Sequence, residues 1–514
     1  MKIHMKTQWM ICFIIFFQLE LTFANSKTNS SLNSIPVGQL LMLGFNEKNL
    51  SPELIKHLKF IRPGAIILFR RNIENPLQLK KLITQLHSEL NPEGLTPILI
   101  AIDQEGGNVF RIPTIPRIPS AAVIGNSKDE NLAQQYGYII GKILRQNGIS
   151  MNLAPVLDVE SPKLNSFIGS RSFGDDAGWV ARLGYLFSKG LASAGVIPTG
   201  KHFPGIGSVN LDPHLTTPES NLEWYQDWNK ELLPFREFSR LTPSALMLSH
   251  VIYPKLDQKR NPASISPYII KKVLRETLNY KGLVITDDLL MDGITKKLSP
   301  NEAAIESLKA GADLIMLSWS KVDQIKVFQG LSSSISSGLL DINEIQAKIN
   351  HVQQIKHLLR LNEMNKEINS ERAFSWNSPE LARINQKLLE KILELGKNRY
   401  KKISSISSIY LLNLSHDWLM TLKSYYPQKA LHLVTSVNEY KKASESEKKS
   451  SVLIIGVKSK KSLLEIENLS DVEKSSIILV VTSDININNK NSFYSVFEPK
   501  WPFENLVNKI IQYL

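Results

Sequence analysis

The sequence predicts an α/β protein: a (β/α)8 barrel of the TIM type, followed by a smaller C-terminal α/β domain with an open sheet. Two observations predict the barrel. Eight short apolar runs alternate with amphipathic stretches between residue 36 and about residue 320, as strands alternate with helices around a parallel sheet. Polar residues gather where these runs end, at the positions that form the active-site face of such a barrel.

The expected strands and helices follow one another in regular order. The apolar runs are LLMLGF (40–45), GAIILF (64–69), PILIAID (97–103), MNLAPVLDV (151–159), IPTGKHF (197–203), ALMLSHV (245–251), GLVITDDL (282–289) and ADLIMLS (312–318). The clearest helical patterns cover 75–90, 131–148, 177–195 and 266–280. Several end near a glycine that precedes the next strand, as helices commonly do. An open doubly wound sheet is the alternative, but no Gly-x-Gly-x-x-Gly fingerprint follows the first strand.

The rest of the chain predicts a second, smaller unit. We assign the barrel domain to 25–340, a helical linker to 341–400 and a C-terminal α/β domain to 401–514. Its expected strands are 409–414, 430–436, 452–457 and 475–482, and the helix PFENLVNKIIQYL closes the chain. It shows no evident set of acid, base and nucleophile, so we expect roles in packing, at the substrate rim or in dimerisation.

The first residues are typical of a secretory signal peptide, which we assign to 1–24. Lys2 and Lys6 precede the apolar run 9–17, and the small-residue segment 22–24 offers a cleavage site. The run is shorter than an ordinary membrane span of about 20 residues. We therefore expect export to the periplasm or the cell exterior, without stable membrane insertion after cleavage. An uncleaved N-terminal anchor is the alternative. Cys12 is the chain's single cysteine, so the mature protein would contain no disulfide.

The charge of the chain does not indicate a nucleic-acid partner. The formal net charge is +13 over 514 residues, but the lysines are scattered and concentrate late, in 441–451 and 458–462, where acidic and serine residues interleave. Such segments are typical of solvated surfaces, and attraction to an anionic envelope polymer is a weaker alternative. No RNA- or DNA-binding motif is visible, and the sequence indicates no oligomeric state.

The polar residues at the strand ends should converge on one pocket. They are Arg70-Arg71-Asn72, Asp103-Gln104-Glu105, Asp158, Lys201-His202, His250 and Asp287-Asp288. Because adjacent side chains of a strand point to opposite sides, only one of Asp287 and Asp288 can face the pocket easily. A carboxylate held there near cations would stay ionised and could attack the anomeric carbon of a sugar.

The loop KHFPGIGSVNLDPH offers the complementary chemistry. Asp212 and His214 form an Asp-x-His pair, and a carboxylate bonded to imidazole fixes its tautomer and raises its basicity. On a loop, this histidine could move in once substrate is bound. Metal binding by His202, Asp212 and His214 is the alternative; the adjoining Lys201 argues against it.

Seven motifs then occur in the order of a known family: GAIILFRRN, AIDQEGG, LAPVLDV, IGSRSF, KHFPGIGSVNLDPH, MLSHVIYP and VITDDLLM. Over roughly residues 36–320 the chain resembles glycoside hydrolase family 3, and most closely its β-N-acetylglucosaminidase branch. Lys-His-Phe-Pro-Gly followed by Asp-x-His is the most specific of these motifs, and DQEGG and DDLxM reinforce it.

The resemblance implies a retaining exo-hydrolase that removes terminal β-linked N-acetylglucosamine from peptidoglycan fragments or chitin-like oligosaccharides. Asp287 would be the nucleophile that forms a covalent glycosyl-enzyme, His214 the general acid/base and Asp212 its partner. Four further positions hold the sugar in that branch: Asp103, Arg171, Lys201 and His202. The implied partner is an amino-sugar oligosaccharide, and no metal or organic cofactor is implied.

Three positions depart from the family pattern. Ile206 replaces a usual histidine, Asn108 a usual arginine and Pro213 a usual serine. We expect altered loop packing or aglycone contacts and one lost charge contact, but retained activity. The competing hypotheses are a family 3 β-glucosidase, a phosphorolytic variant, a catalytically impaired glycan-binding protein and a metal-dependent hydrolase.

Overall fold

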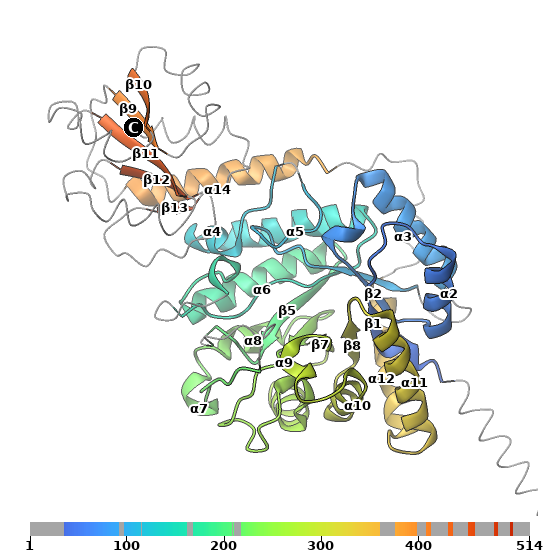
Figure 1. Ribbon diagram of the computed structural model, residues 1–514. Helices are drawn as coiled ribbons and strands as arrows, with labels where there is room; N and C mark the ends of the chain where they lie inside the picture. The colour runs from blue at the N-terminus through green and yellow to red at the C-terminus, as the bar shows by residue number, and fades with distance from the viewer. Residues whose placement is uncertain are drawn as a thin grey trace, which may run out of the picture.

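The computed structural model describes the barrel almost completely and the C-terminal part by its strands. It covers residues 35–91, 97–114, 116–161, 168–207, 209, 217–359 and 376–397, and the strand segments 408–412, 430–434, 451–457, 477–481 and 494–496. Figure 1 shows barrel strands such as β1, β5 and β8 surrounded by helices, with a small sheet formed later in the chain.

The eight predicted strands are present and close into a barrel in sequence order, which confirms the fold class. They are β1 (Leu41–Leu43), β2 (Ala65–Leu68), β3 (Leu99–Ile102), β4 (Met151–Asn152), β5 (Ile197–Phe203), β6 (Ala245–Leu248), β7 (Leu283–Asp288) and β8 (Leu314–Leu317). Each pairs in parallel with its neighbours, and β1 closes the ring on β8. The strands are almost wholly buried, which explains why they read as continuous apolar runs rather than alternating ones.

The helices cover the barrel, and the longer ones begin at side-chain caps. Their bounds are α2 (Pro52–Ile61), α3 (Pro76–Leu90), α4 (Ala121–Asn126), α5 (Glu130–Gln146), α6 (Ala177–Ser193), α7 (Trp224–Asp227), α8 (Leu233–Phe238), α9 (Asp292–Thr295), α10 (Pro300–Ala310) and α11 (Lys321–Ser336). The side chain of Asn75 accepts a hydrogen bond from the first turn of α3, and Ser299 and Glu302 form a capping box on α10.

One expected helix differs in type. The pattern over 266–280 predicts an α-helix, whereas Tyr268–Thr277 (η5) is a π-helix. Its apolar side chains still face the core, with Ile269, Ile270, Val273 and Leu274 buried. Apolar spacing alone therefore predicted which residues are buried but not the hydrogen-bond pattern, since both helix types can bury one face.

Two helices after the barrel pack onto it. In α12 (Ile342–Leu358), the buried Lys356 donates to the side-chain oxygen of Gln39 at 3.0 Å. In α14 (Pro379–Lys397), Asn385 accepts from the hydroxyl of Tyr136 on α5 at 2.8 Å; Figure 1 shows α14 lying along α5. The predicted linker 341–400 thus contains two helices that form hydrogen bonds with the barrel. The domain boundaries themselves stay predictions.

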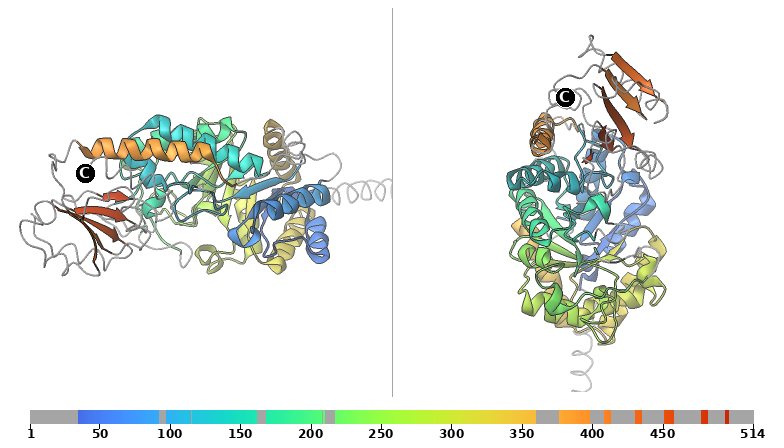
Figure 2. Two further views of the ribbon diagram at one scale, coloured as in Figure 1. Left: turned by 90° about the horizontal axis from the view of Figure 1, so that it is seen from above. Right: turned by 90° about the vertical axis from the view of Figure 1, so that its left-hand side faces the viewer.

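The C-terminal strands form one parallel sheet in the order β10-β9-β11-β12-β13. The four expected strands are present as β9 (Ser408–Leu412), β10 (Ala430–Val434), β11 (Ser451–Val457) and β12 (Ile477–Val481). A fifth, β13 (Tyr494–Val496), was not expected. In sequence numbering the order is 2-1-3-4-5, the order of doubly wound open sheets of the flavodoxin type. Both views of Figure 2 show this sheet outside the barrel.

Several predicted segments lie outside the described residues. These are the signal segment 1–24 with Cys12, the lysine-rich stretches 441–451 and 458–462, and the closing helix 502–514. Within the part of the chain that the structure describes, no helix is long and apolar enough to cross a membrane.

Candidate active site

Two barrel strands change register where they reach the predicted site. The pairing of β5 with β6 shifts between Gly200 and Phe203, and the pairing of β7 with β8 shifts between Ile285 and Asp288. Such irregularities re-aim side chains at strand ends. They lie at the segments that carry Lys201, His202 and Asp287, so the chain departs from regular pairing where it presents these residues.

Five charged side chains form an alternating network at the carboxyl ends of the strands. The ammonium of Lys201 lies 3.0 Å from an oxygen of Asp103 and 2.7 Å from an oxygen of Glu105. Asp103 also accepts from Arg111 at 3.1 Å. Arg171 donates from Nε and Nη2 to the two oxygens of Glu105, both at 2.9 Å. Since three cations meet two carboxylates, the network holds one positive charge in excess.

The two carboxylates and the lysine of the network are buried, whereas Arg111 and Arg171 are partly exposed. The side chains of Lys201 and Glu105 are 4% and 6% exposed. Burial alone would raise the pKa of Glu105, but the attraction of Arg171 and Lys201 outweighs it and holds that pKa well below its usual range. Burial would lower the pKa of the Lys201 ammonium, yet Glu105 and Asp103 raise it. Removing one partner would leave an uncompensated buried charge.

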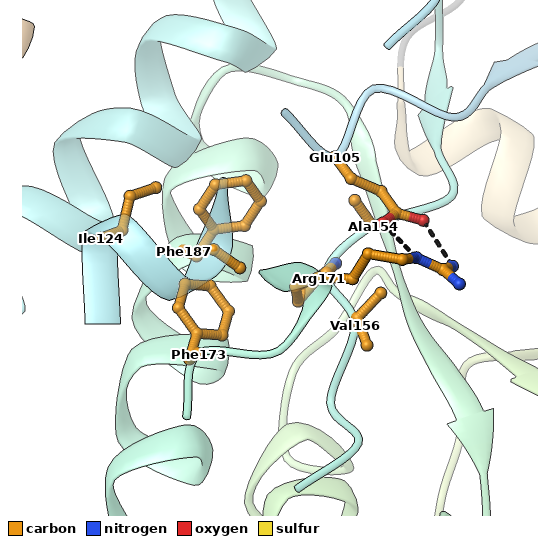
Figure 3. A pocket seen from close by; sticks show the side chains of 9 residues that line it. Glu105, Ile124, Ala154, Val156, Arg171, Phe173 and Phe187 are labelled. Atoms are coloured by element: carbon orange, nitrogen blue, oxygen red, sulfur yellow. Dashed lines mark hydrogen bonds and ion pairs between the residues drawn. The ribbon is translucent and has the colours of Figure 1, made fainter. Parts of the chain in front are cut away.

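An apolar wall stands beside the Glu105–Arg171 pair. Figure 3 shows the two hydrogen bonds of the pair on one side of a small pocket, with Ile124, Phe173 and Phe187 on the other. The two phenyl rings meet edge to face with their centroids 5.9 Å apart. Apolar surroundings exclude water from this side of the ion pair, and attraction between charges is stronger where water is excluded.

His202 is held by Asp158, a strand-end carboxylate for which the sequence predicted no specific role. Asp158 accepts from its ring Nδ1 at 2.8 Å and from its backbone N–H at 3.2 Å. Because a carboxylate only accepts, Nδ1 carries a proton and Nε2 is the ring nitrogen left to face a ligand. Asp158 also accepts from the backbone N–H of Ile206 at 2.9 Å, so one side chain fixes both the histidine and the start of the loop.

The loop start is packed tightly on the segment after β4. The side chain of Ile206 is buried in the hydrophobic core. A Cβ on Gly207 would come within 1.7 Å of the carbonyl oxygen of Val159, so only glycine fits there. The departure at Ile206 therefore adds to the core and leaves its backbone contact with Asp158 in place, whereas Asn108 is exposed at the surface.

The two aspartates at the end of β7 have different surroundings. Asp288 is buried; it accepts from the backbone N–H of Leu290 at 3.0 Å and from the hydroxyl of Ser318. Burial is the main cause that raises its pKa to about 6. Asp287 is half-buried, and one of its oxygens accepts from the backbone N–H of Asp288 at 2.8 Å. The two carboxylates therefore differ in burial and in hydrogen-bond partners, while the role of Asp287 as the nucleophile stays a prediction.

The sequence comparisons place the chain in a family. The model for the glycosyl hydrolase family 3 N-terminal domain matches residues 35–355. The chain belongs to glycosyl hydrolase family 3. It is 35% identical over 261 residues to a β-hexosaminidase of Nitrosomonas eutropha, covering 49% of this chain and 73% of the relative. A β-hexosaminidase of Tolumonas auensis is 34% identical over 304 residues, with 58% and 88% covered. The chain is accordingly a glycoside hydrolase.

Solved structures extend this family relationship beyond the barrel. The family 3 β-N-acetylglucosaminidase of Paenibacillus sp. str. FPU-7 is similar over 93% of this chain and 95% of its own, with a TM-score of 0.75 and 28% identity. NagZ of Neisseria gonorrhoeae, solved with N-trifluoroacetyl-D-glucosamine, covers 64% of this chain and 96% of its own, with a TM-score of 0.53 and 30% identity.

The structure brings together three of the predicted site residues of this family 3 enzyme in one charged network. Asp103, Arg171 and Lys201 share one network, and His202 follows Lys201 on β5. The predicted catalytic pair Asp212 and His214, with Pro213 between them, lies outside the described residues. The sequence placed Glu105 and Asp158 among the strand-end residues expected to converge on one pocket, but it gave them no role, and it did not single out Arg111. Nothing in their spacing indicated which side chain each carboxylate would meet.

Proposed function

We propose that the protein is a retaining exo-β-N-acetylglucosaminidase that removes terminal β-linked N-acetylglucosamine from peptidoglycan fragments or chitin-like oligosaccharides. The observation that carries the proposal is the buried Asp103–Lys201–Glu105–Arg171 network beside His202, at the carboxyl ends of the strands of a family 3 barrel. The names of its relatives, β-hexosaminidase and β-N-acetylglucosaminidase, support the choice of sugar.

The network suits the binding of a neutral, hydroxyl-rich ring. Asp103 is buried and already bonded to Lys201 and Arg111, so its carboxylate keeps a fixed orientation in which it can accept from sugar hydroxyls. Because the network carries an excess positive charge, its cations can donate hydrogen bonds to oxygen atoms of the ligand. His202, fixed by Asp158 through Nδ1, adds an oriented ring nitrogen.

In the proposed reaction, Asp287 attacks the anomeric carbon while His214, paired with Asp212, protonates the departing glycosidic oxygen. The C–O bond breaks, and a glycosyl ester on Asp287 forms. His214 then takes a proton from water, which attacks the same carbon and releases the sugar and Asp287. We also propose export through the segment 1–24, which would bring the enzyme to polymers outside the cytoplasm.

The proposed function predicts a defined pattern with aryl glycosides. The wild type should release the aryl group from β-N-acetylglucosaminides and leave the matching β-glucosides almost intact, at equal rates with and without added phosphate. His214→Ala should lose about 10²–10⁴-fold with poor leaving groups, which need a proton, and much less with activated ones. Steady-state kinetics over a leaving-group series measures both effects.

The same experiment tests the sugar specificity and the acid role of His214 independently of each other. Faster turnover of β-glucosides by the wild type would refute the choice of sugar, and a rate that rises with phosphate would indicate phosphorolysis. Equal slowing of good and poor leaving groups by His214→Ala would refute its role as the acid while leaving the sugar specificity intact.

A further inference from the structure

An exposed tryptophan lies at the rim of the active-site face. Trp319 follows the last strand of the barrel, and its side chain is 45% exposed. Val322, in the first turn of α11, is 62% exposed, and Leu77, in the first turn of α3, is 76% exposed. These helices follow β8 and β2, the two strands that flank β1. Scattered exposed apolar side chains are ordinary, but an exposed indole that directly follows a barrel strand at the catalytic face can contact a ligand.

The backbone on both sides of Trp319 is fixed. Ser318 donates from its hydroxyl to Asp288, and its carbonyl accepts from Arg71 at 2.8 Å. On the other side, Ser320 caps α11 by accepting from the backbone N–H of Asp323 at 3.2 Å. Lys321 adds an ion pair to Glu47 in the segment after β1. Trp319 is therefore presented on a rigid support, although its own ring remains half in solvent.

Arg71 reinforces that support. Its guanidinium donates to the carbonyl of Phe45 at 3.0 Å as well as to that of Ser318, which ties the ends of β1 and β8 to the segment after β2. The same guanidinium lies 4.2 Å from the centre of the Phe69 ring. Three strand ends are thus joined around the position of Trp319, and a preorganised aromatic surface binds a ligand without a further ordering cost.

The position is close to the proposed reaction centre. Ser318 bonds Asp288 directly, and Asp288 is the chain neighbour of Asp287. One hydrogen bond and two peptide units therefore separate Trp319 from the proposed nucleophile. A sugar held at Asp287 would direct the next ring of an oligosaccharide outward over the rim of the barrel.

We propose that Trp319 forms the platform for the sugar ring on the leaving-group side of the scissile bond. The inference rests on the proposed function and specifies the substrate class: an oligosaccharide whose second residue is a pyranose. The C–H bonds of a pyranose form apolar faces that pack on an aromatic ring, while its hydroxyls remain in water or reach polar groups.

The inference is tested by the binding of two sugars, of which only the larger would reach Trp319. The probes are free N-acetylglucosamine and the thio-linked β-disaccharide of N-acetylglucosamine, which is not hydrolysed; calorimetry gives both dissociation constants. Trp319→Ala should raise the constant for the disaccharide about 10-fold and leave that for the monosaccharide within about 2-fold. Trp319→Phe, which keeps an aromatic face, should recover most of the disaccharide affinity.

Tyr268→Ala is the matched control, since Tyr268 is an aromatic residue of similar exposure, 46%, on η5. It should change neither constant. An unchanged disaccharide affinity in Trp319→Ala would overturn the inference, as would equal weakening of both sugars. If disaccharide binding depends on Trp319 while aryl N-acetylglucosaminides are not cleaved, the proposed function fails, and Trp319 remains a contact for the second sugar ring only.

Discussion

Replacing Asp287 by asparagine should lower kcat/KM for aryl β-N-acetylglucosaminides by roughly 10⁴-fold or more, the scale on which removal of a nucleophile acts. The amide has the shape of the carboxylate but cannot form the glycosyl ester. Incubation with a 5-fluoro-N-acetylglucosaminyl donor, which slows breakdown of the intermediate, should add one sugar mass to the wild type and none to Asp287→Asn. Intact-protein mass spectrometry measures this difference.

A second variant, Asp288→Asn, tests whether Asp287 or Asp288 is the nucleophile. Asp288 is buried against Ser318 and Leu290, and its pKa is raised to about 6. Its neutralisation should therefore disturb the strand end without preventing formation of the glycosyl ester, so Asp288→Asn should still gain the sugar mass. A label on Asp287→Asn and none on Asp288→Asn would reverse the assignment.

Glu105→Gln should cost about 3–5 kcal/mol of the free energy of unfolding, because it leaves Arg171 and Lys201 in the barrel without their shared carboxylate. Asp103 alone would then face the three cations of the network. Urea unfolding followed by circular dichroism measures the loss, and sugar binding should weaken in parallel because Lys201 and Arg171 lose their fixed positions.

The pH dependence of this loss has a defined sign. The pKa of Glu105 is lowered in the folded protein, so its contribution is present above the unfolded value of about 4.3 and is lost as the pH falls below it. The free energies of unfolding of the wild type and of Glu105→Gln should differ by the full amount at pH 7, and the difference should shrink as the pH becomes acidic. Glu130→Gln, the control, removes an exposed partner of Arg182, and its free energy of unfolding should equal that of the wild type. A similar shift in both variants would contradict the role of burial.

The barrel could be predicted because its strands and helices carry strong local patterns. Fully buried parallel strands give continuous apolar runs, and β1–β8 all fall within the predicted segments. The C-terminal sheet was predicted for the same reason, except for the short β13, whose three residues are too few to form a pattern. The π-helical hydrogen bonding of η5 leaves no mark in apolar spacing.

The site was predicted less completely than the fold. Strand-end position and family motifs pointed to Asp103, Arg171, Lys201 and His202. The pairing of carboxylates with cations depends on contacts between residues far apart in the sequence. The sequence therefore could not predict that Glu105 bridges Arg171 and Lys201. Ile206 illustrates the same limit: the departure from the motif suggested altered loop packing or aglycone contacts. Only the structure shows that its side chain lies in the core and that its backbone N–H donates to Asp158.

The central claim is that hydrolysis proceeds through a glycosyl-enzyme on the barrel and therefore retains the configuration of the sugar. Proton NMR during wild-type cleavage of an aryl β-N-acetylglucosaminide shows which anomer forms first, before mutarotation mixes the two. Two successive displacements predict the β anomer as the first product. Initial release of the α anomer would show direct attack by water and contradict the account.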